Sequence, residues 1–403
     1  MADFDVIKQI SKKTDSKILY IVIDGLGDLP HPEFENKTPL EAAKIPNLDR
    51  LASEGNCGLT IPVRLGITPG SGPAHLSLFG YHPLKFEIGR GVLSALGIGI
   101  DLRESDVAAR VNFCTIDKNG KITDRRAGRI STEICAERCA LLSKIEIPGV
   151  EILFNPEMEY RASLVLRGKD LGGKVSDTDP QILGVEPLPA NGGDEESSKT
   201  ADIVNKIAAR AKELLAGYDK ANMILLRGFD QYQKLPSMRE IYNLNPACIA
   251  TYPMYRGVTR LLGMTVLDAG DSIESEFKAL EKHINEFDFF YLHIKKTDSA
   301  GEDGDFIKKV HVLEELDGFL KDIDKKDFSA IVICGDHSTP CVMKSHSWHP
   351  IPFILFSRVN SRKDETRRFN ENECLKGVLG TFYAEDAITL ALASAGKLNK
   401  FGA

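Results

Sequence analysis

The chain has 403 residues, of which 42% are hydrophobic and 27% are charged, and its formal net charge is −7. This length exceeds what one small core requires and predicts two domains in a globular protein. The negative charge argues against a surface that neutralises nucleic-acid phosphates, and no apolar run approaches the roughly 18 residues of a membrane span.

Apolar runs of strand length alternate with helical patterns, which predicts an α/β fold with a largely parallel sheet. These runs alternate little, as expected for strands covered on both faces. In chain order, the expected strands cover 18–24, 162–168, 222–228, 288–294, 329–336 and 352–356. The expected helices cover 39–54, 131–144, 199–216, 272–284, 306–321 and 384–395. Residues 187–202, rich in Pro, Gly, Ser and acids, predict an exposed loop.

The polar motifs fall before about residue 100 and after about residue 290. This distribution predicts a core domain built from both ends of the chain, 1–107 and 264–403, with a smaller inserted α/β domain over 108–263. The eight cysteines form no CxxC pair, and the first residues lack the apolar stretch of a signal peptide. We therefore expect a cytoplasmic protein with reduced core thiols rather than disulfides or a zinc site.

Acidic residues follow three of the expected strands. Asp24 ends the first strand, Asp336 ends the strand at 329–336, and Asp298 lies just beyond the strand at 288–294. A single aspartate in such a place is usually a helix cap or a turn residue. Three of them can converge beyond the carboxyl ends of parallel strands, where bound cations would offset their mutual repulsion.

Histidines cluster beside the last of these acids. His337, His346 and His349 are three of only nine histidines, and they lie within thirteen residues. A lone histidine is more often a satisfied polar residue than a ligand. Carboxylate oxygen with imidazole nitrogen suits Zn or Mn, and sites richer in oxygen suit Mn or Mg.

Ser71 stands between two glycines in a Gly/Pro-rich turn that leads into a short helical pattern from Pro73. The glycines leave its hydroxyl uncovered, and a following helix would offer N–H groups to an anion. A divalent cation nearby favours ionisation of such a hydroxyl. The alternative is a plain turn serine. The esterase GxSxG elbow differs, because here the glycines flank the serine directly.

Several segments, in order and over nearly the whole chain, resemble the signatures of archaeal-type cofactor-independent phosphoglycerate mutases of the alkaline phosphatase superfamily. They are Asp24-Gly25, TPGSGPAHL around Ser71, 89–112, DRRAGRIS (124–131), VSDTDP (175–180), TDSAGEDGD from Thr297, GDHSTPC (335–341) and HSWHPIP (346–352). The resemblance implies an alkaline-phosphatase-like core that binds two metals and an inserted domain that grips the substrate.

The resemblance also implies the ligands of two divalent metal ions. One ion would be held by Asp24, Ser71, Asp336 and His337, and the other by Asp298, Glu302 and His346. Many relatives have histidine where this chain has Glu302. The extra carboxylate shifts the expected metal toward Mn or Mg and away from Zn. His349 receives no role.

A phosphorylated hydroxy acid needs cationic forks for its phosphate and its carboxylate, and arginine binds both groups in bidentate fashion. Most arginines are simply solvated at the surface. The candidates for substrate binding are Arg90, Arg125, Arg129, Arg161, Arg227 and Arg256. Arg125, Arg161 and Arg227 match the family pattern, whereas Arg256 stands where relatives often have lysine and keeps the positive charge. Asp124, beside Arg125 and Arg126, should stay ionised and would serve as the base for a substrate hydroxyl, with turn capping as the alternative.

The resemblance implies a mutase reaction. Ser71 takes the phosphoryl group, glycerate reorients, and its other hydroxyl, deprotonated by Asp124, recaptures the group, so 2- and 3-phosphoglycerate interconvert. A related phosphatase or homoserine-kinase-like phosphotransferase should lack the Asp124 and Arg125 pair. A catalytically dead binding or scaffold protein should have lost Ser71 or a ligand. The expected partner is the small phosphoglycerate, with neither nucleic acid nor membrane.

Overall fold

A computed structural model describes residues 4–402 of the chain. It divides into two compact units. The core unit combines the residues through Glu87 with Pro236–Tyr252 and the residues from Leu262 onward. The inserted unit combines Ile88–Leu235 with Pro253–Leu261.

These boundaries differ from the expected divisions at 107/108 and 263/264. Helix α5 (Arg90–Gly97) packs on strand β3 (Val107–Ile116) and so belongs to the inserted unit. Strand β8 (Pro246–Ile249) pairs with β10 (Phe289–Ile294) and so belongs to the core unit. Both boundaries are set by how short elements pack. The expected boundaries were placed from the positions of polar motifs, which do not indicate that packing.

The core unit contains an eight-stranded sheet. Its strands, in spatial order, are β13 (Gly380–Tyr383), β2 (Asn56–Ile61), β12 (Ile351–Phe356), β11 (Ala330–Cys334), β1 (Ile18–Ile23), β10, β8 and β9 (Thr265–Val266). Strand β1 runs parallel to both neighbours, β11 and β10, whereas β12 runs antiparallel to both of its neighbours. The expected α/β core with a mainly parallel sheet is confirmed.

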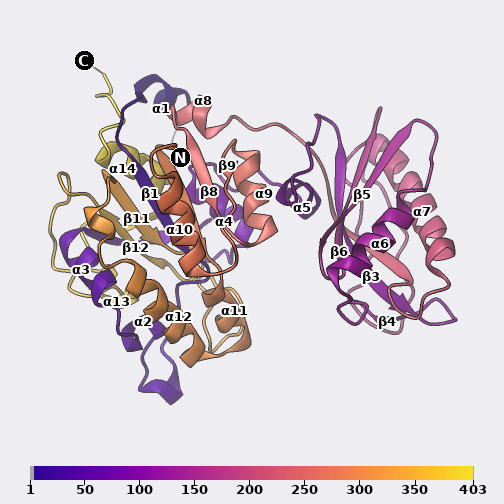
Figure 1. The fold of residues 1–403 in the computed structure, drawn as a ribbon, viewed down its shortest axis with the longest axis horizontal. Coiled ribbons are helices and arrows are strands. Elements are labelled where there is room, and N and C mark those ends of the chain that lie inside the picture. Colours follow the sequence, from indigo (N-terminus) through magenta and orange to yellow (C-terminus); the bar gives the residue numbers. More distant parts are fainter. Residues whose placement is uncertain (1–3, 403) are drawn as a thin grey trace. The chain divides into compact units, whose positions relative to one another are not determined.

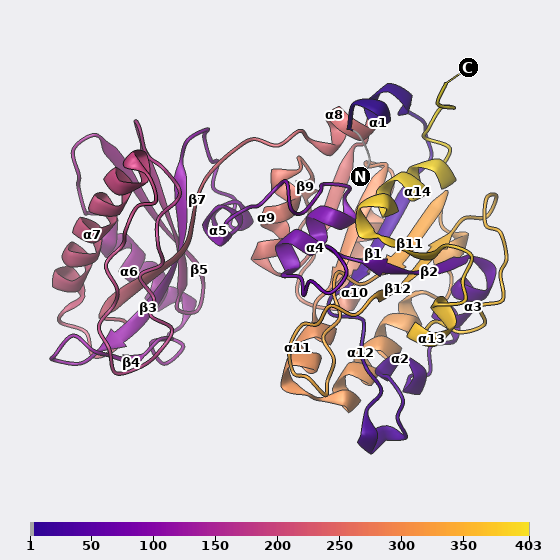
Figure 2. The same ribbon diagram turned by 180° about the vertical axis from the view of Figure 1, so that it is seen from behind.

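Both faces of this sheet are covered, as the apolar strands predicted. Leu19, Ile21 and Ile23 of β1 point to the face covered by α3 (Pro46–Glu54), α10 (Ile273–His283) and α12 (Phe306–Phe319). Figure 1 shows α10 and α12 in front of the sheet. The opposite face carries α4 (Ser71–Leu78) and α14 (Ala387–Ser394), which Figure 2 shows from behind. The site-bearing loops therefore follow β1, β10 and β11, strands that are buried at every residue.

The inserted unit contains a second sheet, of five strands. They are β3, β4 (Ile122–Asp124), β5 (Val150–Met158), β6 (Arg161–Gly168) and β7 (Met223–Gln231), and their pairings are antiparallel. Two of the strands expected for a parallel sheet, 162–168 and 222–228, lie here instead. Helices α6 (Thr132–Leu142) and α7 (Glu195–Leu215) cover one face and α5 packs on the same strands. Burial made their sequences apolar irrespective of strand direction.

The remaining expected elements need two corrections. The helix expected over 39–54 splits into α2 (Pro39–Ala42) and α3, because Pro46 cannot continue a helix from Ile45. The loop expected over 187–202 ends at Asp194, whose side chain accepts a hydrogen bond from Ser197 N–H and caps α7. The other helices are α1 (Phe4–Ile10), α8 (Met238–Tyr242), α9 (Pro253–Leu261), α11 (Lys296–Asp303) and α13 (Glu371–Cys374).

Two further expectations concern environment. All eight cysteines are buried free thiols, as the sequence predicted. Within residues 4–402, no helix has both the length and the apolar character that crossing a membrane requires.

Candidate functional site

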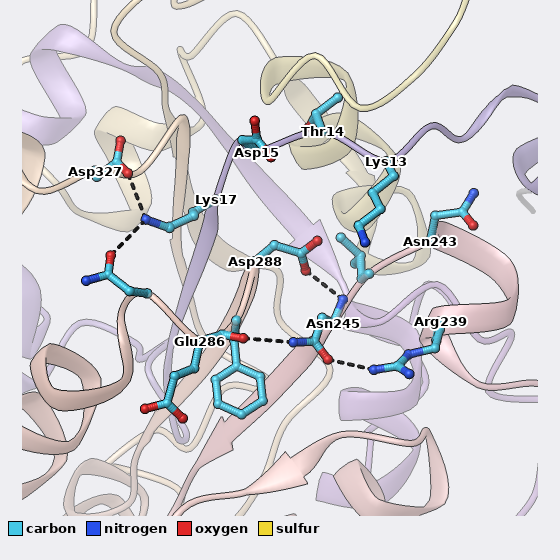
Figure 3. A pocket seen from close by; sticks show the side chains of 13 residues that line it. Lys13, Thr14, Asp15, Lys17, Arg239, Asn243, Asn245, Glu286, Asp288 and Asp327 are labelled. Atoms are coloured by element: carbon cyan, nitrogen blue, oxygen red, sulfur yellow. Dashed lines mark hydrogen bonds and ion pairs between the residues drawn. The ribbon is translucent and has the colours of Figure 1, made fainter.

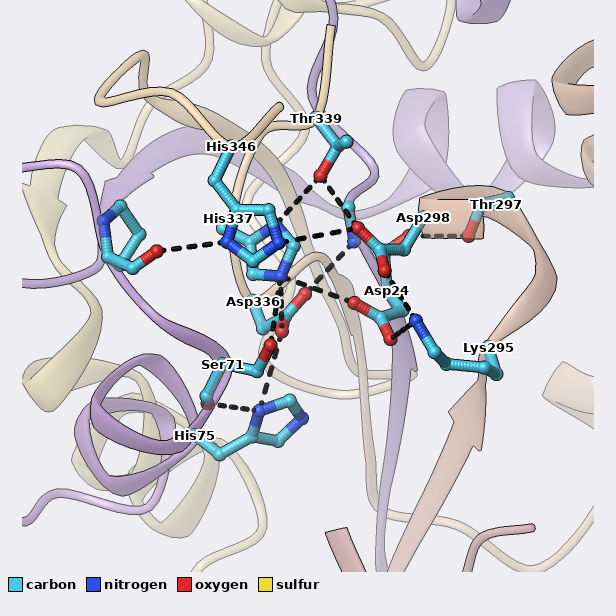
Figure 4. A network of polar contacts seen from close by, with 12 residues as sticks. Asp24, Ser71, His75, Lys295, Thr297, Asp298, Asp336, His337, Thr339 and His346 are labelled. Carbon is cyan, nitrogen blue, oxygen red and sulfur yellow. Dashed lines mark hydrogen bonds and ion pairs between the residues drawn. The ribbon is translucent and has the colours of Figure 1, made fainter. Parts of the chain in front are cut away.

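The three acids expected to converge do meet at one edge of the core sheet (Figure 4). Asp24 directly follows β1, Asp336 follows β11 by two residues, and Asp298 lies in α11 just after β10. These three strands are adjacent and parallel, so their carboxyl ends point to the same side. The topology therefore brings together residues separated by some 300 positions in the sequence.

Asp24, Asp336 and His337 form the first cluster, and all three are buried. His337 Nε2 lies 3.3 Å from Asp24 Oδ1 and 3.2 Å from Asp336 Oδ2. The hydroxyl of Ser71, the first residue of α4, lies 3.3 Å from the same nitrogen. The nucleophile expected from the sequence is thus in contact with this cluster.

Asp298, His337 and His346 form the second cluster. His346 Nε2 lies 3.6 Å from Asp298 Oδ1, and the rings of His337 and His346 stack with their centroids 3.6 Å apart. His346 Nδ1 lies 3.0 Å from the carbonyl of Pro69, which assigns the proton to Nδ1. Its Nε2 then carries the lone pair, and the Nδ1–H bond to a carbonyl is the kind of contact that orients metal-binding histidines.

The charges of the first cluster perturb one another strongly. Burial alone would raise the pKa of Asp24, but the charge of Lys295 and the hydrogen bond with His337 hold it well below its usual range. Burial and the nearby charge of Asp24 raise the pKa of Asp336 to about 7. Burial would lower the pKa of His337, yet the surrounding acids raise it to about 9. Buried carboxylate oxygens with imidazole nitrogens form a donor set that fits a divalent cation.

The structure adds site residues that sequence reasoning missed. Thr339 Oγ1 lies 2.9 Å from Asp298 Oδ1 and 3.0 Å from His337 Nδ1, so one hydroxyl links two members of the second cluster, and His337 also belongs to the first. His75 Nδ1 donates to the Ser71 carbonyl over 2.8 Å, and burial lowers the pKa of His75 to about 4. The available signal was spacing, because His75 follows Ser71 by four residues on one helical face.

Gly25 makes this close approach of loops feasible. Its φ is +62°, and a Cβ at this position would lie 2.6 Å from Thr339 Oγ1. Only glycine adopts this conformation readily and leaves the space free. The backbone conformation and the space at position 25 therefore both require glycine after Asp24.

A separate pocket rich in arginine lies within the inserted unit, with a volume of about 280 Å³. Its lining residues are Arg90, Arg110, Asn112, Arg125, Arg126, Tyr160, Arg161, Gln181 and Arg227. Strand pairing places Arg110 of β3 directly opposite Arg227 of β7, and Asn112 opposite Arg161 of β6. Like charges opposite each other destabilise a sheet, so this arrangement favours a bound anion.

Two acids hold the arginines of this pocket. Asp179 accepts two hydrogen bonds from Arg125, from Nε over 3.0 Å and from Nη2 over 2.7 Å. Asp177 accepts from Arg227 Nε over 3.3 Å. Burial alone would raise the pKa of Asp179, but the hydrogen bonds from Arg125 and from the Gln181 N–H, with the charges of Arg125 and Arg227, outweigh burial and lower it. Asp177 and Asp179 in the VSDTDP segment thus orient the guanidinium groups.

Comparisons with known proteins show the family of this chain. A family model described as 2,3-bisphosphoglycerate-independent phosphoglycerate mutase matches residues 52–219. A protein of Thermotoga neapolitana, named a probable 2,3-bisphosphoglycerate-independent phosphoglycerate mutase, is 50% identical over 399 residues, which cover 98% of each chain. The chain belongs to this family. A protein of the same name from Thermus thermophilus is 48% identical over 408 residues, which cover 99% of each chain.

Solved structures agree with this membership of the phosphoglycerate mutase family. The cofactor-independent phosphoglycerate mutase of Thermoplasma acidophilum is 30% identical with a TM-score of 0.73, and the match covers 94% of this chain and 100% of that one. A protein from Pyrococcus horikoshii is 29% identical with a TM-score of 0.84, covering 97% and 100%.

Some residues expected from the phosphoglycerate mutase family stand apart from these groups. Glu302 is exposed on α11, four residues after Asp298, and belongs to neither cluster. Arg129 and Arg256 do not line the arginine pocket, and Arg129 pairs with Glu159 over 3.7 Å. Asp124 caps a turn, since its two oxygens accept from the N–H groups of residues 126 and 128.

A larger hollow, of about 740 Å³, lies elsewhere in the core unit (Figure 3). Lys17, Asn245 and Asp288 line it and directly precede β1, β8 and β10, so it lies at the amino ends of these strands. Its charges pair locally, with Lys17 Nζ 2.7 Å from Asp327 Oδ2. The acid–histidine clusters lie at the opposite, carboxyl ends of these strands, where open α/β sheets bind their ligands.

Proposed function

We propose that this chain interconverts 2-phosphoglycerate and 3-phosphoglycerate without 2,3-bisphosphoglycerate as a cofactor. The observation that carries the proposal is the contact between the Ser71 hydroxyl and a buried Asp/His cluster, in a chain whose inserted unit also has a pocket rich in arginine. Phosphoglycerate carries a phosphate and a carboxylate, and guanidinium groups bind both. The family name of relatives matched over their full length supports the same reaction.

We propose two divalent metal ions for this site. Asp24, Ser71, Asp336 and His337 would hold one ion. Asp298, Glu302 and His346 would hold the other, and Glu302 lies on the face of α11 that carries Asp298 because the two are four residues apart. Mn or Mg suits this oxygen-rich set better than Zn. Bound there, such ions supply positive charge that stabilises a transferring phosphoryl group and favours ionisation of a nearby hydroxyl.

The chain's own residues would carry the two half-reactions. Ser71 Oγ attacks phosphorus and forms phosphoserine, while the bond from phosphorus to the substrate oxygen breaks and that oxygen takes up a proton. Arg125, Arg161 and Arg227 retain glycerate, with Arg129 and Arg256 as further candidates from the family pattern. The other hydroxyl then gives its proton to Asp124 and takes the phosphoryl group as the bond from phosphorus to Ser71 Oγ breaks. Ser71 Oγ regains a proton and Asp124 releases its own, which restores the starting state. The buried free thiols fit a reducing, cytoplasmic location.

The test is a coupled assay of phosphoglycerate interconversion without added bisphosphoglycerate. We expect activity that chelation abolishes and Mn²⁺ restores. Ser71→Ala should be inactive and carry no phosphoserine. Asp124→Asn should lose about 10²–10⁴-fold in turnover while phosphoserine at position 71 remains detectable by mass spectrometry. A wild-type protein that releases inorganic phosphate but forms no isomer would instead be a phosphatase, and the proposed function would be wrong.

A further inference from the structure

Lys295 joins the two acid–histidine clusters of the core unit. It is the residue between β10 and α11, and its side chain is only 24% exposed. Its Nζ lies 3.0 Å from Asp24 Oδ2 and also pairs with Asp298 Oδ2. Asp24 belongs to the first cluster and Asp298 to the second, so one ammonium group contacts an acid of each (Figure 4).

Each of these acids divides its two oxygens between lysine and histidine. Asp24 turns Oδ1 to His337 Nε2 and Oδ2 to Lys295, with His293 Nε2 3.6 Å from that second oxygen. Asp298 turns Oδ1 to His346 Nε2 and Oδ2 to Lys295. Lys295 therefore contacts the oxygen of each carboxylate that does not face His337 or His346.

A fixed positive charge in this place has two opposite effects. It stabilises Asp24 and Asp298, which are buried and would otherwise repel each other. It also repels any further cation that the same carboxylates bind, because charges a few ångströms apart interact strongly away from bulk water. The neighbouring Lys296 is exposed, and its charge acts on the buried Glu276. The ion pairs with Asp24 and Asp298 are made by Lys295, so Lys296 offers a comparison for metal binding.

We propose that Lys295 is the resident counter-cation of this site. It holds Asp24 and Asp298 together when no metal is bound, and it lowers the affinity of the site for divalent ions. A bound metal ion is therefore repelled by the lysine charge, and this repulsion lets the ion dissociate and exchange. This inference rests on the proposed metal site, in which both acids are ligands.

The test is calorimetric titration of Mn²⁺ into chelator-stripped, dialysed protein, for wild type, Lys295→Met, Lys295→Gln and the control Lys296→Met. We expect both Lys295 variants to bind Mn²⁺ at least about tenfold more tightly than wild type. Their melting temperature should fall in the metal-free form and return to near the wild-type value with Mn²⁺. Lys296→Met should match wild type in its affinity for Mn²⁺ and in the rise of melting temperature that Mn²⁺ produces.

The outcomes separate the two proposals. If wild type binds Mn²⁺ and both Lys295 variants bind it equally or more weakly, Lys295 positions the ligands and the counter-cation role is wrong. If no protein in the set binds Mn²⁺, the metal site itself is wrong and this inference falls with it. The glutamine variant keeps a hydrogen-bond donor and guards against simple loss of folding by the methionine variant. Weaker binding by the glutamine variant alone would also overturn the proposal.

Discussion

Arg110 and Arg227 face each other directly on neighbouring strands, an arrangement that costs folding free energy. Val111 and Leu226 point to the face of the inserted sheet that α6 and α7 cover. Arg110 and Arg227, their neighbours in the two strands, therefore lie on the opposite face. Asp177 and Asp179 offset part of the repulsion through Arg227, at 3.3 and 3.5 Å. The same two positive charges that lower the free energy of unfolding would strengthen the binding of an anion placed between the guanidinium groups.

Replacement of one member of this pair should therefore have opposite effects on binding and stability. We expect Arg110→Gln to raise the KM for phosphoglycerate about 10- to 100-fold, through loss of a charge-assisted contact. The same change should raise the free energy of unfolding of the ligand-free protein by about 0.2–1 kcal/mol. Steady-state kinetics and urea unfolding measure the two quantities. Arg210→Gln, an exposed residue of α7 that does not line the pocket, is the control, and an unchanged KM in Arg110→Gln would contradict the role.

At the residue scale, the sequence located acids and the nucleophile but not their supports. Asp24, Asp298 and Asp336 were predictable because each lies near the end of an apolar strand, and parallel strands end on one side. Lys295 and Thr339 were not, because their contacts depend on loop conformation. Arg110 was predictable in principle, since it alternates with the inward-facing Ala109 and Val111.

At the element scale, helix α10 contains a buried acid, Glu276, on the face that packs against the core sheet. Burial raises the pKa of Glu276 to about 8, with the charge of Lys296 opposing that shift. In the unfolded chain the same carboxyl titrates near its ordinary value. The folded state therefore favours the protonated form of Glu276 more than the unfolded state does. This difference makes the free energy of unfolding depend on pH.

The sign follows from proton binding. Between pH 4.5 and about 8 the folded state keeps the proton of Glu276 and the unfolded state releases it, so its contribution to stability falls as pH rises. Glu276→Gln should remove this fall. Relative to wild type, the variant should gain up to about 1.4 kcal/mol per pH unit across this window, measured by urea unfolding. Glu274→Gln, exposed on the same helix, should show no such gain, and parallel pH profiles for Glu276→Gln and wild type would contradict the assignment.

The sequence predicted where elements lie better than how they pair. The strands at 18–24 and 162–168 have the same apolar character, yet one lies in a parallel sheet and the other in an antiparallel one. Burial on both faces produces that character in either arrangement, so only the pairing partners decide direction. Helix α7 begins four residues before the expected position, because Asp194 caps it there. The sequence did not predict this start, since the composition around Asp194 is typical of a loop.

At the scale of the whole molecule, each unit has a hydrophobic core of its own. The acid–histidine clusters lie in the core unit, and the arginine pocket lies in the inserted unit. A ligand stabilises the unit that binds it by mass action, by about 2.7 kcal/mol at 100 times Kd. Metal and phosphoglycerate should therefore protect different parts of the chain.

Hydrogen exchange followed by mass spectrometry tests this division. With Mn²⁺ alone, we expect slower exchange in core-unit peptides that contain Asp24, Asp298 and His337. With 3-phosphoglycerate and a chelator, we expect slower exchange in peptides from β3 and β7 of the inserted unit, by up to about 100-fold where exchange requires opening of that unit. Arg110→Gln should weaken only the second effect, because it removes a pocket charge and leaves the clusters intact. Protection by metal-free 3-phosphoglycerate confined to the core unit would show that the arginine pocket does not bind the substrate.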